Sequence, residues 1–361
     1  MKSLKRIIFK KVKMISYFCL YYSGLLSLIL RLYKLFKKDH KAVILLYHQI
    51  VDRNTEEYIF KSHAVHHHLR SFKAEMRILK KWFDVVSLDS IIDHIKEGKQ
   101  FSRPTTAITF DDGYRDNYTL AYPVMREFRF PATIYLTTGL INTNKRTWVD
   151  TIEYALLKTK EKSVSIPELF GDQTISIATK KELEAANSDI GEAMKKVSES
   201  EKLRLINELY NRLGVEKKPE EEDCKPRMLS WDEIKEMKKN HISFGSHTNN
   251  HPVLTKIPID KAKEEILSST MLLKEKVGEA RHFAFPNGTH KDFNEELNNY
   301  CKEIGLESIA TAEYGIVDLD SNPHYMGRFI PQVPIYMFAA ELVRLFILSG
   351  KFAKRKEYDK K

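Results

Sequence analysis

The sequence contains few cysteines and no internal repeat. Three cysteines, Cys19, Cys224 and Cys301, lie far apart among 361 residues. An odd and scattered set of this kind excludes a disulfide framework and a cysteine-type zinc ribbon. With 42% hydrophobic and 30% charged residues, the chain is globular and can bury one large core or two modest ones.

The sequence near the N-terminus also lacks an uncharged stretch long enough to span a membrane easily. The stretch Met14–Leu30 carries no charge, but it is shorter than the roughly 20 residues that cross a bilayer with ease. Basic residues flank it on both sides, so they give no clear orientation. No small-residue cleavage motif follows, and we therefore expect no cleaved signal peptide.

Three alternatives remain for residues 1–41: a short spanning anchor, a helix in the membrane interface, and an ordinary buried helix. Tyr17, Tyr21 and Tyr22, with lysines nearby, are typical of a membrane interface. Residues 331–361 predict an amphipathic helix with a basic tail. Its alternative is a terminal helix packed on the core.

Positive charge is concentrated at the two ends of the chain. The net charge is +10, residues 1–41 carry +10 and residues 344–361 carry +5, which leaves the region between them near −5. This distribution argues against a nucleic-acid partner and favours a membrane surface. Nothing in the sequence implies a protein partner. We expect association with a bacterial cytoplasmic membrane, on a side that the charges do not define.

Between the two ends, strand patterns alternate with helix patterns. Such an order predicts an α/β fold with a parallel sheet, which we expect to be a distorted barrel of seven or eight β/α units over residues 42–330. Strands are expected at Val43–Tyr47, Val85–Leu88, 107–110, Thr133–Leu136, Ile242–Gly245, His282–Phe285 and Ser308–Thr311. Residues 158–226 are rich in Lys and Glu and predict a charged, mainly helical insertion.

Asp111 and Asp112 end the apolar stretch 107–110 and precede a glycine. Because side chains alternate along a strand and its extension, the two carboxylates can have different roles, one as a metal ligand and the other as a base. A simple Asp-Gly turn is the structural alternative.

His247 and His251 follow another predicted strand and are four residues apart. Two imidazoles and one carboxylate form the three-ligand set with which catalytic zinc activates water. Two surface histidines are the alternative. His48 and the Pro286-Asn287 turn also follow predicted strands, and the carboxyl ends of parallel barrel strands share one rim. The four polar groups are therefore expected to lie together.

The motifs ITFDDGY, HTNNH and FAFPNG resemble those of the polysaccharide deacetylases of the NodB-homology class, carbohydrate esterase family 4. LLYHQI, Leu88-Asp89-Ser90 and PATIYLTTG resemble the branch that deacetylates exported poly-N-acetylglucosamine and related exopolysaccharides. The resemblance covers residues 42–330 apart from the insertion. It implies a hydrolase that removes N-acetyl groups from a bacterial cell-surface polysaccharide or its lipid-linked precursor.

The same resemblance implies roles for individual residues. Asp111 would be the general base, and Asp112, His247 and His251 would hold one divalent metal ion, for which zinc is expected. The acid that protonates the amine is a histidine of a C-terminal Leu-x-His motif in many members, and this chain lacks that motif. The Tyr-His pair near the start suggests His48 for that role, with His324 as the alternative.

The family's Arg-x-Pro-Tyr motif is also altered. The chain reads Ala284-Phe285-Pro286-Asn287, without the arginine that braces the base, although a backbone donor for an oxyanion survives at Asn287. For substrate contacts we single out a small set of residues. These are Tyr114, Pro286, Asn287, Trp148 and Arg328.

The histidine-rich tract His63, His66, His67 and His68 looks like a metal site, but no partner motif accompanies it, and we expect no metal there. Two other functions remain open. One is a carbohydrate-binding barrel without catalysis, which the missing arginine and C-terminal histidine suggest. The other is a hydrolase of O-acetyl esters or of lipid-linked formyl or acetyl amides.

Overall fold

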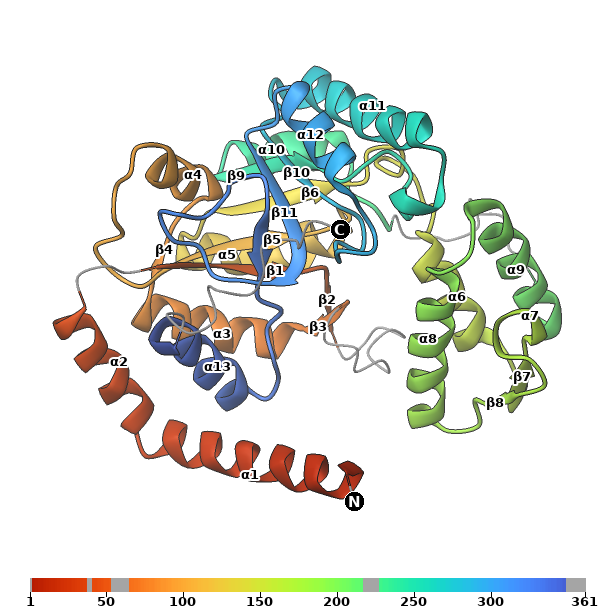
Figure 1. The fold of residues 1–361 in the computed structure, drawn as a ribbon, viewed down its shortest axis with the longest axis horizontal. Coiled ribbons are helices and arrows are strands. Elements are labelled where there is room, and N and C mark those ends of the chain that lie inside the picture. The colour runs from red at the N-terminus through yellow and green to blue at the C-terminus, as the bar shows by residue number, and fades with distance from the viewer. Residues whose placement is uncertain (1, 38–40, 53–64, 217–226, 349–361) are drawn as a thin grey trace.

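The computed structural model describes residues 2–37, 41–52, 65–216 and 227–348. At its centre lies a barrel of parallel strands surrounded by helices (Figure 1). This confirms the predicted α/β barrel. The strand order is β1 (Ala42–Tyr47), β5 (Thr105–Phe110), β6 (Ala132–Leu136), β9 (Ile242–Ser246), β10 (His282–Ala284), β11 (Ser308–Tyr314) and β12 (Met326–Arg328).

The barrel closes between its last strand and its first. The Leu46 N–H donates to the Phe329 carbonyl at 2.9 Å, and the Phe329 N–H donates to the Ile44 carbonyl at 2.8 Å. The ladders between neighbouring barrel strands are parallel. The carboxyl ends of these strands therefore meet at one rim, where active sites of α/β barrels assemble.

Helices cover the outside of the barrel. They are α3 (Leu69–Trp82), α4 (Leu88–Lys96), α5 (Tyr122–Phe128), α10 (Trp231–Lys238), α11 (Ile259–Val277), α12 (Glu295–Glu303) and α13 (Ile335–Leu348). The predicted strand Val85–Leu88 is wrong in its second half, because β4 covers only Asp84–Val85. Ser87 accepts a hydrogen bond from the Ser90 N–H and so caps α4, which begins at Leu88.

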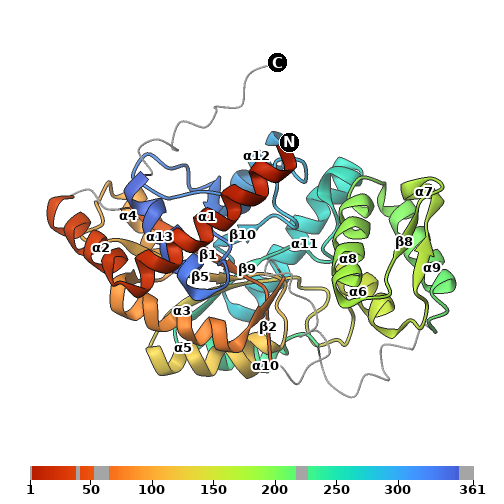
Figure 2. The same ribbon diagram turned by 90° about the horizontal axis from the view of Figure 1, so that it is seen from below.

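The insertion forms a lobe with its own hydrophobic core, set to one side of the barrel (Figures 1 and 2). That core includes Trp148, Ile190 and Leu205, so the lobe begins at α6, before the boundary expected near residue 158. The lobe contains α6 (Trp148–Lys158), β7 (Ser163–Ser165), α7 (Pro167–Phe170), β8 (Thr174–Ser176), α8 (Lys180–Met194) and α9 (Glu199–Arg212). The acidic end of the predicted insertion, 217–226, lies outside the described residues.

The N-terminal segment folds into two helices, α1 (Lys2–Tyr22) and α2 (Leu25–Phe36). They meet at Gly24, whose φ of 77° is readily adopted only by glycine, and their axes differ by 75°. Within the described residues, no single helix has the length and apolar character to cross a membrane, although the bent pair together meets that criterion by length and composition. Figure 2 shows α1 crossing the barrel beside α13.

Two further strands, β2 (Gln49–Val51) and β3 (His66–His68), pair in parallel beside the start of α3. The histidine tract is therefore part of a small sheet. His63 and the basic tail 349–361 lie outside the described residues.

Candidate active site

The pair Asp111 and Asp112 follows β5 directly, at the carboxyl rim of the barrel. Asp112 has a φ of 75° and Gly113 a φ of 81°. A left-handed aspartate is less stable than an extended one and persists where its surroundings require it. This turn gives the two carboxylates separate partners, as the alternation of side chains predicts.

Asp112 faces both histidines that follow β9. Its Oδ1 lies 3.4 Å from His247 Nε2 and 3.2 Å from His251 Nε2. One donor atom from each residue lies within 4.8 Å of the other two, and all three side chains are buried. The structure thus brings together the three predicted metal ligands.

The chemistry of these donors fits a divalent cation. His247 Nδ1 lies 2.7 Å from the Ala284 carbonyl oxygen. Because a carbonyl only accepts, Nδ1 carries the hydrogen and the Nε2 lone pair faces Asp112. Asp112 Oδ1 is buried with no hydrogen-bond donor within the described part of the chain. Two imidazole nitrogens and a carboxylate oxygen with converging lone pairs suit zinc or a similar metal.

Electrostatics keep Asp112 ionised. Burial raises the pKa of its carboxyl, but His251 and His247 outweigh burial and bring the pKa well below its usual range. Burial lowers the pKa of His247, and Asp111 and Asp112 more than reverse this. A carboxylate that stays charged at neutral pH is the form that a metal requires.

Asp111 is held by Arg328, which ends β12. The guanidinium donates to both carboxylate oxygens of Asp111 at 2.7 Å. It also donates to the Thr109 hydroxyl at 3.2 Å and to the Thr311 carbonyl at 2.8 Å. Burial raises the pKa of Asp111, but Arg328 and then His247 lower it below the ordinary value.

Arg328 therefore corrects two expectations. The sequence suggested that the arginine bracing the base is absent and that Arg328 contacts substrate. Its side chain is instead fully buried and bonded to Asp111. The bracing arginine comes from a strand near the end of the chain and not from the turn at Pro286.

His48 also lies near Asp111. Its Nε2 is 3.9 Å from Asp111 Oδ2, and its side chain is 19% exposed. Burial lowers the pKa of His48, against the opposing effect of Asp112 and Asp111. His48 thus lies at the rim, close to the proposed base and within reach of solvent.

His324, the alternative acid, lies at the other end of the strands. Its Nε2 is 2.9 Å from the carbonyl oxygen of Leu306, just before β11 begins. The neighbouring Pro323 carbonyl accepts from the N–H of Ile309, near the start of the same strand. His324 is therefore at the amino edge of the barrel, away from the rim.

Two histidines of the tract lie next to buried carboxylates. His66 Nε2 lies 3.0 Å from Glu153, and His67 Nε2 lies 2.9 Å from Glu75. All four of these side chains are buried, so the two histidines join the small β2–β3 sheet to α6 and α3. The described metal-ligand cluster contains none of them.

Tyr114 was expected to contact substrate, but the structure places its hydroxyl against the insertion. The side chain is buried, and its hydroxyl donates to Asp150 at 3.1 Å. Because Asp150 lies in the first turn of α6, Tyr114 links the metal-site turn to the insertion. This contact contradicts a direct substrate role for its hydroxyl.

The Pro286-Asn287 turn follows β10. Asn287 has a φ of 61°, and its side-chain amide nitrogen is buried without a partner among the described residues. The carbonyl of Ala284, three residues earlier, orients His247. The turn thus carries an unused donor next to the strand that supports the metal ligand, and Pro286 and Asn287 remain predicted substrate contacts.

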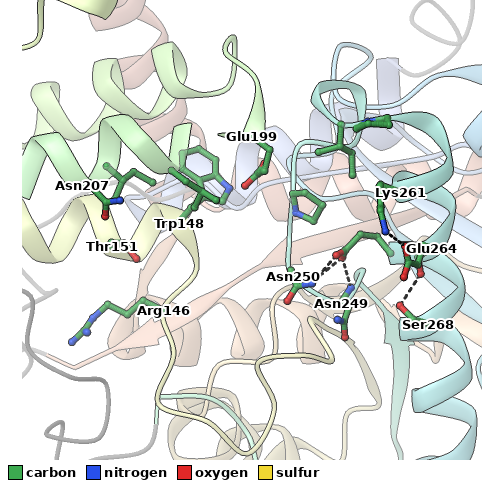
Figure 3. A pocket seen from close by; sticks show the side chains of 16 residues that line it. Arg146, Trp148, Thr151, Glu199, Asn207, Asn249, Asn250, Lys261, Glu264 and Ser268 are labelled. Carbon is green, nitrogen blue, oxygen red and sulfur yellow. Dashed lines mark hydrogen bonds and ion pairs between the residues drawn. The ribbon is translucent and has the colours of Figure 1, made fainter. Parts of the chain in front are cut away.

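A cavity of about 870 Å³ lies between the insertion and the barrel (Figure 3). On the insertion side it is lined by Trp148, the predicted substrate contact, and by Arg146 from the loop before α6. On the barrel side it is lined by Asn249 and Asn250, which belong to the HTNNH motif. Lys202 Nζ lies 4.6 Å from the centre of the Trp148 ring, so one face of that ring is already covered.

Glu265 of α11 is a site residue that the sequence did not indicate. Its carboxylate accepts from the Asn249 N–H at 3.0 Å, from the Asn250 N–H at 2.8 Å and from the Asn250 side chain at 2.6 Å. It thereby fixes the loop that carries both predicted metal-binding histidines. In the sequence it is one more acid in a charged helix, which gave no signal.

Comparisons with known proteins agree with this arrangement. Residues 98–309 match the polysaccharide deacetylase family. The chain is 31% identical over 105 residues to YxkH of Bacillus subtilis, which is classed with the polysaccharide deacetylases. That match covers 28% of this chain, and the chain spans about a third of YxkH, 33% of its length.

Two solved structures share the fold. The deacetylase PplD of Streptococcus pyogenes, in complex with acetate, is 17% identical with a TM-score of 0.56, covering 85% of this chain and 99% of that one. IcaB from Ammonifex degensii is also 17% identical, with a TM-score of 0.54, covering 85% of this chain and 98% of that one. Since the family match extends over more than half of the sequence, this chain belongs to the polysaccharide deacetylase family.

Proposed function

We propose that this protein is a metal-dependent hydrolase that removes N-acetyl groups from a polysaccharide. One observation carries the proposal: Asp112, His247 and His251 converge beside a second carboxylate, Asp111, that has its own arginine. The metal ligands and the proton acceptor are thus separate groups, as hydrolysis of an unactivated amide requires. Family membership and the deacetylase PplD support the same activity.

Each residue has a distinct task in this proposal. Asp112, His247 and His251 hold the metal, which supplies Lewis acidity that activates water and polarises the acetyl carbonyl. Asp111 accepts the proton of the attacking water, and Arg328 keeps Asp111 ionised and oriented until then. His48 donates a proton to the departing amine. Its lowered pKa makes the imidazolium a readier donor, although a smaller fraction is protonated at rest.

The substrate that we propose is a glycan chain of a bacterial cell surface or its lipid-linked precursor. The cavity beside the HTNNH loop is lined by amide, carboxylate and ammonium groups, together with Trp148. Sugars are bound by such polar groups and by the edges and faces of aromatic rings. Figure 3 shows these side chains on both walls, so that a chain can lie between the barrel and the insertion.

The two reasons for considering a carbohydrate-binding barrel without catalysis do not hold in the structure. That alternative depended on a missing arginine and a missing C-terminal histidine. Arg328 occupies the bracing position, and His48 lies 3.9 Å from the base.

Substitutions at the two adjacent carboxylates test the proposal. Asp112→Ala should abolish both bound metal and acetate release from an N-acetylated oligosaccharide, because a ligand is lost. Asp111→Asn should retain metal and lose turnover by about 100-fold or more, since only the proton acceptor changes. Metal content is measured by elemental analysis, and acetate by an enzyme-coupled assay.

His324→Ala is the matched control for His48→Ala, and only the latter should reduce acetate release. Equal loss of metal in both aspartate variants would mean that the two carboxylates do not have separate roles. Faster acetate release from O-acetylated than from N-acetylated glycan would identify an esterase.

A further inference from the structure

The outer faces of α1 and α2 carry two continuous apolar stripes. On both helices, exposed apolar residues recur every three or four positions and so lie along one face. They are Ile8, Val12, Ile15, Phe18 and Tyr22 on α1, and Leu25, Leu28, Leu32 and Leu35 on α2. With Phe9, Met14 and Phe36, these helices hold twelve of the eighteen large exposed hydrophobic side chains in the described part of the chain. A patch of this size marks an interaction surface.

The inner faces of the same helices are fixed to the barrel. Leu26 and Leu30 of α2 are buried in the barrel core. On α1, Tyr17 donates to Glu341 of α13 at 3.3 Å, and Lys13 forms an ion pair with the same carboxylate. Lys34 donates to the carbonyl of Trp82 at the end of α3. The helix pair is therefore docked, and its outer stripes keep a fixed position on the molecule.

The geometry of the pair does not suit a straight crossing. The 12 residues of α2 extend about 18 Å, against about 30 Å of hydrocarbon. Helix α1 is longer, but Lys10, Lys11 and Lys13 lie near its middle. The 75° bend at Gly24 turns the second helix away from the axis of the first. Figure 1 shows the two helices along the lower edge of the molecule, and Figure 2, seen from below, shows α1 running across the face turned to the viewer with α2 at its end.

The basic residues beside the apolar stripes indicate which kind of partner covers this surface. Lys10 and Lys11 flank the stripe on α1, and Arg31 and Lys37 flank it on α2, all four exposed. A second copy packed face to face would bring like charges together. Anionic lipid headgroups complement the same residues, and each lysine or arginine near such a surface contributes about 1 kcal/mol.

We propose that α1 and α2 attach this protein in the plane of an anionic membrane surface, without crossing it. The apolar stripes enter the boundary between headgroups and acyl chains, and the basic residues contact the phosphates. In both views α2 lies at one end of the molecule and the insertion at the other. This inference does not depend on the proposed function.

Flotation with lipid vesicles tests the attachment. The full chain should float with vesicles of phosphatidylglycerol and phosphatidylcholine, and less with phosphatidylcholine alone. The triple variant Phe9→Gln, Ile15→Gln, Leu35→Gln should lower the bound fraction about tenfold or more, because apolar burial drives insertion. Lys10→Glu with Lys11→Glu should weaken the preference for anionic vesicles, since Arg31 and Lys37 remain.

Leu267→Gln with Met271→Gln is the matched control, since both side chains are exposed hydrophobics on α11. It should float like the wild type. Acetate release from a soluble oligosaccharide should be unchanged in all these variants, which separates this test from the proposed function. Equal flotation of the triple variant and the wild type would overturn the proposal, as would a dimer that fails to float and becomes a monomer in the triple variant.

A second measurement separates lying on the membrane from crossing it. In spheroplasts, an N-terminal tag and a tag placed in the insertion should be digested by protease from the same side. Protection of one tag and digestion of the other would mean that the bent pair crosses, and would overturn the in-plane arrangement.

Discussion

The guanidinium of Arg328 determines the protonation state of Asp111. A buried carboxylate without a counter-charge has a raised pKa, because burial disfavours the charged form. Arg328 supplies two hydrogen bonds and a positive charge, and the pKa of Asp111 falls below its ordinary value. A general base must be unprotonated, so this pairing extends its action toward acidic pH.

Replacing Arg328 by Met should therefore shift the pH dependence of hydrolysis. Burial would then dominate, the pKa of Asp111 would rise, and the acidic limb of kcat/KM would move to higher pH. Arg328→Lys, which keeps the charge but not the two parallel bonds, should shift it less. Profiles of kcat/KM against pH measure the effect, and metal content should stay unchanged. An unaltered acidic limb in Arg328→Met would refute this role.

Helix α6 also contains a buried carboxylate with a shifted pKa, that of Asp150 in its first turn. It forms a capping box with Thr147, whose hydroxyl donates to it at 2.9 Å, and it accepts from Tyr114. Burial, followed by the nearby charge of Glu153, raises the pKa of Asp150 to about 6 from its ordinary 3.8. The first turn of α6 thus contains a carboxyl group that ionises at a higher pH than an ordinary aspartate.

Stability should consequently fall as pH rises from about 4 to about 6. In this window the unfolded chain releases the proton of Asp150 first, so the folded state binds more protons and loses relative stability. Asp150→Asn should remove this decline, worth up to about 3 kcal/mol. Urea unfolding at pH 4 and pH 7 measures it. The exposed Asp172→Asn is the control, and identical pH slopes in wild type and Asp150→Asn would contradict the assignment.

The sequence patterns predicted the helices and strands more accurately than the contacts between distant residues. The bounds of helix α11 can be read from the sequence, because its apolar period is regular and Gly278 ends it. Strand ends also identified Asp112 and the two histidines that the structure brings together. The bond from Arg328 to Asp111 could not be read, because β12 has only three residues and its partner lies 217 residues earlier. The alternation of strands and helices does not show which arginine will bind the carboxylate of Asp111.

On the scale of the whole molecule, the chain has more than one hydrophobic core. The core of the insertion contains Ile190, which is fully buried in α8. The barrel has its own clusters, and one of them contains Ile266 of α11. Regions with separate cores open separately, since each depends on its own apolar burial.

Ile190→Ala should therefore loosen the insertion without loosening the barrel. The substitution removes buried methyl groups and should cost about 2–5 kcal/mol of local stability. Amide hydrogen exchange should accelerate across residues 148–215 and stay unchanged in β5 and β9. Metal binding should persist, while KM for a long glycan should rise. Ile266→Ala is the comparison within the barrel, and uniform acceleration in Ile190→Ala would show that the cores unfold together.

The position of β12 near the end of the chain also sets the order in which the parts of the site are synthesised. The chain leaves the ribosome from its N-terminus, so the metal ligands emerge before the strand that carries Arg328. Until that strand inserts next to β1, the barrel is open and Asp111 lacks its two hydrogen bonds from Arg328. A nascent or prematurely terminated chain therefore lacks an ionised, oriented base.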